Sequence, residues 1–360
     1  MQKLDLFLFG AGASRGARPV DSPPLGATLH RYLLNYLCLP KAELEILEEP
    51  ADGTRPDKTR SHLKQLLEAT NSYEQLVDQL KQRGERGLLE KLNLLMAYAL
   101  TPPINHDPKV DNAFVEKVDL YDRFLLKYFP SRETLQTACF ITLNYDCLLE
   151  RALCRCYHHP PDPKEIRCLC SHIDYQLHLP SNDIPKIKVL KPHGSINWIA
   201  DVTLGDQPYV QDPVVTIDQD DAEEWTRINA VDSPQHKGHA KIAVAHYAQK
   251  KEAQINAGLL KTIRGLSLEQ VERSTTITII GIHIPNNPID DPFLDKFFDL
   301  ARRRTRTGLP VYFVNNCGAE LREASSMGFT PKKCTFEEYV AQLNFECTAR
   351  ITEQAKSSPS

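Results

Sequence analysis

The sequence predicts an α/β domain in which helices cover both faces of a parallel sheet, with a helical module inserted into it. Two observations predict this class. Short apolar runs recur along the chain, and each one ends in a cluster of Gly, Asn or His residues. Helical stretches separate these runs, and this alternation is typical of parallel strands joined by crossover helices.

The first predicted strand is Leu4–Phe9 (LDLFLF), which stops at Gly10. A Gly-rich loop, Gly10–Gly16, follows it, and Pro23 and Pro24 then precede a segment with helical spacing of Leu and Tyr. From Leu44 to Tyr128 the pattern is mostly helical, because Leu residues recur at three- and four-residue intervals. Loops are expected within this stretch at Ala51–Thr59 and Thr101–Asp111.

The rest of the chain, from Cys139 onward, predicts four more strands and two helices. Thr275–Gly281 (TTITIIG) is the clearest strand, because it is β-branched, continuous and ended by Gly. The other expected elements are strands at Cys139–Leu143, Val189–Leu190 and Pro310–Val314, and helices starting at Leu148 and spanning Asp291–Arg304. Residues from Asp201 to about Gly265 are polar and show no clear periodicity.

These elements suggest a single domain at residues 1–350, although a chain of 360 residues also leaves two domains open. The helical insert covers about 40–130, and a second, irregular insert covers about 200–265. The polar end of the chain, 351–360, is expected to be a flexible tail.

The composition excludes several classes of protein. The net charge of −4 gives no excess of positive charge that would attract a polyanion, so direct nucleic-acid binding is not expected. The N-terminus lacks a basic segment typical of signal peptides, and no apolar run reaches the ~18 residues that span a membrane. Together with the irregular spacing of the 10 Cys, this favours a cytoplasmic protein with reduced thiols.

The functional site is expected where the strands end, because parallel α/β sheets bind ligands beyond the carboxyl ends of their strands. Five clusters would meet at this edge: Gly10–Ser14, Asn144–Asp146, His193–Ser195, Gly281 and Asn315. Their common position after strands is stronger support for a site than any one of them alone.

The Gly-rich loop Gly10-Ala11-Gly12-Ala13-Ser14 fits a phosphate-binding turn, in which backbone N–H groups and a helix dipole favour negative charge. It departs from the pattern of dehydrogenases, which place an acidic residue at the end of a second strand roughly 20 residues further on. Here Ala17–Gly26 reads as a loop, and Asp21 lies within it. A hydride-transfer enzyme is therefore disfavoured.

At this point the motifs resemble those of the sirtuin-like proteins, which have a Rossmann-like core. GAGAS with PPLG, TLNYD (Thr142–Asp146) and KPHGSINW (Lys191–Trp198) are similar to the first three motifs of that family. TIIGIHIPNNPIDDPFL and Val314-Asn315 resemble its later segments, and all five stand in the family's order. The chain lacks the Cys-x-x-Cys pairs of protein-deacylating sirtuins. It is similar to the zinc-module-lacking branch of bacterial anti-phage defence, whose members hydrolyse NAD and so deplete it.

The resemblance implies NAD as substrate and cleavage of its nicotinamide–ribose bond to give nicotinamide and ADP-ribose. Asn144 and His193 are then the candidate catalytic residues: the Asn amide would orient the water or the ribose, and the His would act as general base. The expected NAD-binding residues are Gly10, Ala11, Gly12, Ala13, Ser14, Asp146, Gly281 and Asn315.

Each of these residues also has a purely structural interpretation. Asn144 could form an Asx turn after its strand, and His193 could be an ordinary loop residue. Asp146 could simply cap the following helix.

A group of Cys and His residues invites comparison with zinc sites: Cys154, Cys156, Cys168, Cys170, His158, His159 and His172. The Cys-x-Cys spacing is tighter than the two to four intervening residues usual in structural zinc sites. The group also precedes the His-Gly motif, whereas deacylating sirtuins carry their zinc module after it. We therefore expect no metal.

Two other functions remain open: an NAD-dependent protein deacylase or ADP-ribosyl transferase, and a sensor that binds NAD or ADP-ribose without turnover. The resemblance also implies control of a toxic hydrolase by assembly or by a partner. We expect a homo-oligomer, with the helical insert as its surface. A separately encoded activator, such as a DNA-translocase-type ATPase or an Argonaute-like protein, would act on it.

Overall fold

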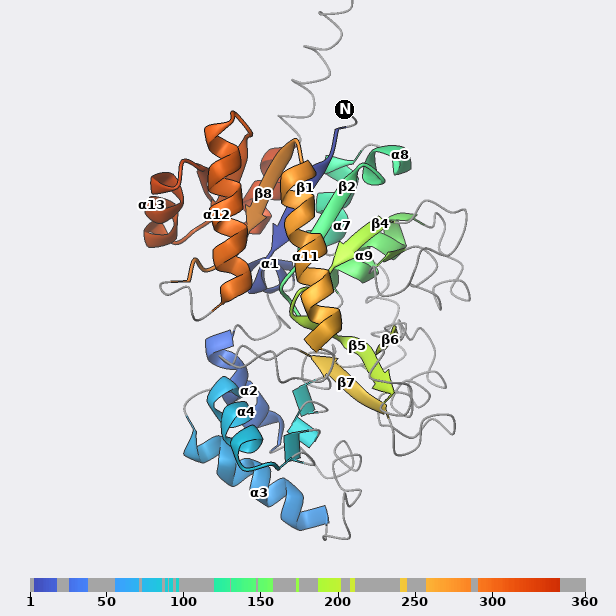
Figure 1. The fold of residues 1–360 in the computed structure, drawn as a ribbon, viewed down its shortest axis with the longest axis vertical. Helices are drawn as coiled ribbons and strands as arrows, with labels where there is room; N and C mark the ends of the chain where they lie inside the picture. Colours follow the sequence, from blue (N-terminus) through green and yellow to red (C-terminus); the bar gives the residue numbers. More distant parts are fainter. Residues whose placement is uncertain are drawn as a thin grey trace, which may run out of the picture.

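The fold was analysed in a computed structural model of the chain (Figure 1). The residues that it describes are 3–17, 26–37, 56–70, 73–85, part of 88–96, 120–157 except 130 and 147, 173–174, 187–201, 208–210, 240–244, 257–285 and 291–343. The expected loop around Asp21, the loop Thr101–Asp111 and the tail 351–360 lie outside these residues.

A parallel sheet of seven strands forms the centre of the fold, in the order β10-β9-β8-β1-β2-β4-β3. Leaving out the two-residue edge strand β3, the chain runs outward from β1 on one side through β2 and β4, and then on the other through β8, β9 and β10. This is the order of a doubly wound, Rossmann-like sheet, with its switch point between β1 and β8. The strands are β1 (Asp5–Phe9), β2 (Ala138–Thr142), β3 (Ile173–Asp174), β4 (Ile187–Leu190), β8 (Thr276–Ile280), β9 (Val311–Asn315) and β10 (Thr330–Lys333).

Helices lie on both faces of the sheet, as the sequence predicts. Figure 1 shows α11 and α12 in front of the strands and α7 and α9 behind them. The helices are α1 (Ala11–Ala17), α2 (Gly26–Tyr36), α3 (Pro56–Ala69), α4 (Tyr73–Gln82), α7 (Leu120–Tyr128), α8 (Arg132–Leu135), α9 (Leu148–Tyr157), α11 (Ala257–Arg273), α12 (Pro292–Arg306) and α13 (Gly318–Ser326). Among the described helices, none is both long and apolar enough to cross a lipid bilayer.

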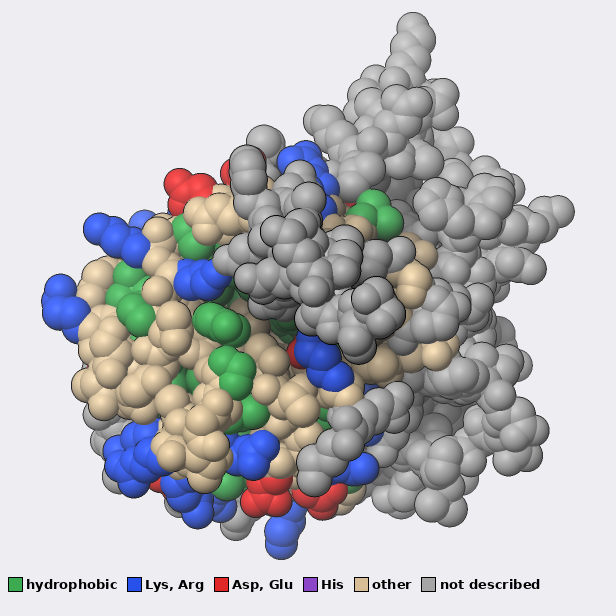
Figure 2. Space-filling view, turned by 90° about the horizontal axis from the view of Figure 1, so that it is seen from above, with side chains coloured by type: hydrophobic (Ala, Val, Ile, Leu, Met, Phe, Trp, Pro, Cys, Tyr) green, Lys and Arg blue, Asp and Glu red, His purple; other side chains and the backbone are tan. Residues whose placement is uncertain are grey.

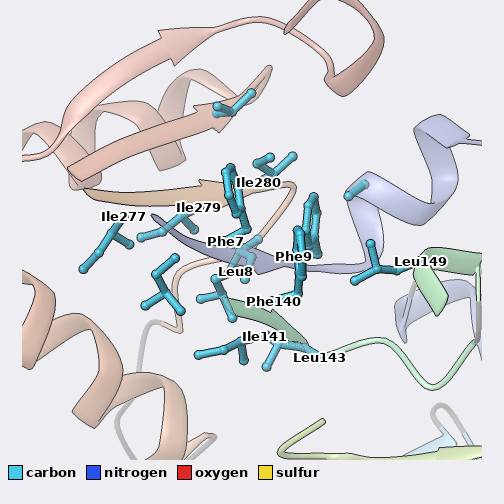
Figure 3. Packing of buried hydrophobic residues seen from close by; sticks show 14 of the residues in the cluster. Phe7, Leu8, Phe9, Phe140, Ile141, Leu143, Leu149, Ile277, Ile279 and Ile280 are labelled. Carbon is cyan, nitrogen blue, oxygen red and sulfur yellow. The ribbon is translucent and has the colours of Figure 1, made fainter. Parts of the chain in front are cut away.

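The core is rich in aromatic side chains on one face of the sheet. Phe7 and Phe140 are register partners on β1 and β2, and their ring centroids lie 5.6 Å apart (Figure 3). Phe124 of α7 meets Phe7 edge-on at 5.3 Å, and Phe336, in the helix 336–343, approaches Phe9 at 5.9 Å. Because these rings are buried and interlocked, they fix β1 and β2 beneath the helices that cover them.

The helical insert has a core of its own. Buried side chains of α2, α3 and α4, among them Leu33, Leu67 and Leu76, form a second cluster separate from that of the sheet. In Figure 1 this unit lies beyond the end of the sheet at which β1 leads into α1. The sheet meets it through Tyr145, which follows β2 and packs against this second cluster.

Three expectations need correction. The Gly-rich loop is shorter than predicted, because helix α1 already begins at Ala11 and the N–H of Ala13 donates to the carbonyl of Gly10 at 3.0 Å. Helix α3 begins at Pro56, inside the expected loop Ala51–Thr59, as suits a residue without an N–H to satisfy.

The second insert is also less irregular than expected. It contains parts of an antiparallel sheet with the order β6-β5-β7, formed by β5 (Gly194–Asp201), β6 (Pro208–Val210) and β7 (Ala240–Val244). Helix α11 begins at Ala257, and its Leu260 and Ile263 are buried in the main core. The end of this segment therefore belongs to the doubly wound domain.

Candidate functional site

The ends of four neighbouring strands lie in one row. Phe9 at the end of β1 pairs with Thr142 of β2 and with Ile280 of β8, and Ile280 pairs with Val314 of β9. Gly10, Asn144 and Gly281, which follow these strands, and Asn315, which ends β9, must therefore emerge at the same edge. The structure thus brings four of the five predicted clusters to this edge, and the fifth, at His193, follows β4, which pairs with β2.

Gly10, Gly12 and Gly281 form a close backbone contact at the switch point of the sheet. Gly281 has a φ of 64°, and a Cβ placed on it would lie 2.4 Å from the backbone nitrogen of Ala13. A Cβ on Gly10 would meet the carbonyl oxygen of Gly281 at 2.5 Å. The backbone angle at Gly281 favours glycine, and the space at Gly10 and Gly281 leaves no room for a Cβ.

This contact already uses N–H groups that the sequence assigned to a phosphate. The N–H of Gly10 donates to the carbonyl of Ile280 at 2.9 Å, and the N–H of Gly12 donates to that of Gly281 at 3.0 Å. Of the predicted cradle, Ala11 is half-buried and Gly12 is exposed, whereas Ala13 and Ser14 are buried. A phosphate that used the N–H of Gly12 would have to displace the carbonyl of Gly281.

Asn144 is buried and ties the end of β2 to the Gly-rich turn. Its Nδ2 donates to the carbonyl of Gly10 at 3.0 Å and to Oγ of Ser14 at 2.8 Å. Because a carbonyl oxygen can only accept, the nitrogen side of the amide must face Gly10. Both amide hydrogens are thus engaged, so only the Oδ1 oxygen could contact a water or a ribose hydroxyl. Tyr121 of α7 completes the group with its hydroxyl 3.2 Å from Oγ of Ser14.

A buried ion pair joins the second motif to the third. Nζ of Lys191 donates to Oε1 of Glu150 at 2.7 Å and to the carbonyl of Asp146 at 2.6 Å, and both side chains are 0% exposed. Burial raises the pKa of the Glu150 carboxyl above its usual range, and the charge of Lys191 offsets this only in part. The Asp146 carboxylate accepts from the N–H of Leu148 at 3.1 Å, which is the capping role that the sequence left open.

His193 follows β4 and is fully buried. Its Nε2 lies 3.1 Å from Oδ2 of Asp291, whose side chain is 1% exposed. This is an ion-pair distance, although the two groups are not aligned as a straight hydrogen bond. The ring also meets Phe293 edge-on at 6.3 Å. The Asp291 carboxylate caps α12, because its Oδ1 accepts from the N–H groups of Phe293 and Leu294 at 3.1 and 3.2 Å.

The far end of the edge is formed by Asn315. Its Nδ2 donates to the carbonyl of Ile282 at 2.8 Å, and its Oδ1 accepts from the N–H of Cys317 at 3.0 Å. Next to it, His283 and Glu320 form an ion pair, and Glu320 also accepts from the N–H of Ile284 at 2.8 Å. The side chain of His283 is exposed, so this end of the site faces solvent.

The predicted site residues are thus linked across three strands, β1, β2 and β4, by side-chain hydrogen bonds. We call the residues that make these links the edge network: Gly10, Ser14, Asn144, Asp146, Glu150 and Lys191. Gly281 packs directly on this network, and His193 lies two residues beyond Lys191. One edge of the sheet thus carries the Oδ1 oxygen of Asn144, the imidazole of His193 and the glycine turn.

Residues 138–228 match the family of the SIR2-like domain. This SIR2-like segment contains Asn144, Asp146, Lys191 and His193 of the site. A comparison with curated protein sequences found no match.

Two solved structures are similar to the chain. One is a crystal structure of a Sir2 homologue in complex with NAD, at 12% identity and a TM-score of 0.43, covering 97% of this chain and 90% of that one. The other comes from work on the mechanism and regulation of Sir2 enzymes, at 11% identity and a TM-score of 0.45, covering 98% and 94%.

In the described part of the chain, no group of three or more His, Cys, Asp or Glu residues could hold a metal ion. The segment 158–172, which carries most of the Cys and His group noted in the sequence, lies outside the described residues. The expectation about zinc therefore stays a prediction.

Lys191, Glu150, Tyr121 and Asp291 were not assigned roles from the sequence. Lys191 stands inside the third motif, and Asp291 before Pro292 has the pattern of a helix N-cap followed by Pro at the first helical position. Both signals are local and visible. The contacts of Glu150 and Tyr121 depend on residues 41 and 107 positions away, so no local pattern indicates them.

On the face of the molecule shown in Figure 2, Lys and Arg side chains are spread around the rim and do not form a single patch.

Proposed function

We propose that this protein is an NAD hydrolase that cleaves the nicotinamide–ribose bond to give nicotinamide and ADP-ribose. The observation that carries the proposal is the contact of Asn144 with Gly10 and Ser14, which joins the second motif to the first at the switch point of a Rossmann-like sheet. The match of residues 138–228 to the SIR2-like domain supports NAD as the substrate. The order of the five sequence motifs supports it further.

The residues fit the substrate in two respects. The glycine turn leaves room for a pyrophosphate, because Gly12 is exposed in the first turn of α1, and the phosphate would take the N–H of Gly12 in place of the carbonyl of Gly281. Gly281 and Asn315 end the next two strands along the edge, which favours a position for the adenosine half beside them. Asp146 supports the site by capping α9 and by accepting from Lys191.

The chemistry needs little acid catalysis, because the leaving nicotinamide becomes neutral. The bond between C1′ and the ring nitrogen breaks, and its electron pair goes to that nitrogen. An oxocarbenium-like state forms on the ribose, and a water oxygen bonds to C1′. His193 takes the proton of this water, and Asn144 accepts a hydrogen bond from the water or a ribose hydroxyl through Oδ1.

We propose an anti-phage defence role on the basis of the resemblance to the zinc-module-lacking branch. A hydrolase that depletes NAD must be restrained, so we propose a homo-oligomer built through the helical insert, with a separately encoded activator. The packing of Tyr145 against the core of this insert would connect such an assembly to Asn144 beside it.

The test is to incubate purified protein with NAD, with and without an acetyl-lysine peptide, and to separate the products by chromatography. Once the restraint is relieved, by a change of protein concentration or by the activator, we expect nicotinamide and ADP-ribose in equal amounts without peptide. Release that requires the peptide and yields an acylated ADP-ribose would identify a deacylase instead. Binding of NAD without any release, in every assembly state of the protein, would identify a sensor and refute the hydrolase.

A further inference from the structure

The sequence assigned no role to the contact between His193 and Asp291. His193 follows β4 and Asp291 caps the start of α12, 98 positions later, and both side chains are buried. Oδ1 of Asp291 already accepts from two N–H groups of α12, which fixes the carboxylate in place. Its Oδ2 lies 3.1 Å from Nε2 of His193.

We infer that Asp291 is a positioning residue that holds His193 with its proton on Nε2, so that Nδ1 is the basic nitrogen of the site. An ionised carboxylate can only accept hydrogen bonds, so a bare Nε2 at this distance would place two lone pairs against each other. The hydrogen of a neutral imidazole therefore belongs on Nε2. The misalignment of the pair does not oppose this role, because such contacts often straighten only when the substrate is bound.

This inference rests on the proposed function for its consequence, namely that Nδ1 takes the proton of the attacking water. When that proton arrives, the imidazolium carries a positive charge 3.1 Å from the carboxylate of Asp291 and is stabilised by it. The edge-on ring of Phe293 restricts the imidazole from the side, so the carboxylate and this ring together limit its rotation.

The chain allows a sharp test, because Asn is as good a helix cap as Asp. In Asp291→Asn the amide oxygen would keep the N–H groups of Phe293 and Leu294, so the amide nitrogen must face His193. That nitrogen donates, so the proton of His193 moves to Nδ1 and the basic atom is lost. The matched control is Asp295→Asn, on the exposed side of the first turn of the same helix.

Two measurements decide the inference. The ¹⁵N shifts of histidine-labelled protein, with the His193 signals assigned by their loss in His193→Gln, give the tautomer without any substrate. We expect protonated Nε2 in the wild type and in Asp295→Asn, and protonated Nδ1 in Asp291→Asn. Nicotinamide release should fall in Asp291→Asn by about 100-fold or more in kcat, with little change in KM and an unchanged melting temperature.

An unchanged tautomer in Asp291→Asn overturns the inference, whatever the activity. So does wild-type turnover in a variant whose tautomer has moved. If the wild type releases no nicotinamide in any state, the proposed function fails, but the tautomers still decide whether Asp291 sets the proton of His193.

Discussion

Replacing Lys191 with Met tests whether the buried ion pair holds the second and third motifs together. The variant removes the positive charge that pairs with the buried carboxylate of Glu150. It also removes the hydrogen-bond donor to the carbonyl of Asp146. Breaking a fully buried pair on one side costs about 3–5 kcal/mol of the free energy of unfolding. We expect a loss of that size in urea unfolding at pH 7.

The double variant Lys191→Met with Glu150→Leu removes both charges at once. Only the carbonyl of Asp146 then lacks its donor, which costs about 1–3 kcal/mol. The double variant should therefore be more stable than Lys191→Met alone, and the cycle should give a large coupling between the two residues. A loss below about 1 kcal/mol in Lys191→Met, or additive losses in the double variant, would refute the view that this pair joins the two motifs.

Three further outcomes are expected. Gly281→Ala should lower the free energy of unfolding in urea by about 2 kcal/mol or more, because a Cβ would both strain the positive φ and crowd the backbone. Gly84→Ala, with φ 69° and open space around it, should lose less, because only the backbone strain applies. Equal losses would contradict the close contact at Gly281. Tyr121→Phe should cost about 0.5–1.5 kcal/mol through the lost contact with Ser14, but it should cost little when it is made in the Ser14→Ala variant, which already lacks that contact. Because the pKa of Glu150 is raised in the folded state, its protonation stabilises the fold at low pH, and this stabilisation is lost as pH rises from about 4.5 through the folded-state pKa. The free energy of unfolding of the wild type, relative to that of Glu150→Gln, should therefore fall over that range. A difference that does not change with pH would contradict the raised pKa.

The strongly patterned strands of the sheet could be predicted from the sequence. Apolar runs ended by Gly or Asn located β1, β2, β8 and β9 to within about one residue, and the helix expected at Asp291–Arg304 is α12 at Pro292–Arg306. These strands are largely buried on both faces, so their apolar composition carries the signal, whereas α12 is indicated by its helical periodicity.

Other elements carry weaker signals. β10 has the sequence TPKK and lies at the edge of the sheet, where polar residues are tolerated, so no apolar run indicates it. Helix α11 follows a polar segment and contains Gly258 and Gly265, which obscured its start at Ala257. Its place in the main core is decided by tertiary packing of Leu260 and Ile263.

The location of the site was predictable, but the contacts within it were not. Strand ends gave the positions of Asn144 and His193 at one edge. That both amide hydrogens of Asn144 are engaged follows from residues more than 120 positions away, and the partner of His193 lies on another helix. Periodicity reports which face of an element is buried, and it does not report which polar groups meet across the fold.

The most direct test of the central claim is the rate of nicotinamide release from NAD by the wild type and by Asn144→Ala and His193→Ala. Lys296→Ala and Glu323→Ala, which change exposed residues of α12 and α13 outside the helical insert, are the matched controls. If the reaction takes place at this edge of the sheet, the first two variants stay folded but no longer release nicotinamide, while both controls keep the wild-type rate. Wild-type rates in folded Asn144→Ala and His193→Ala would contradict it.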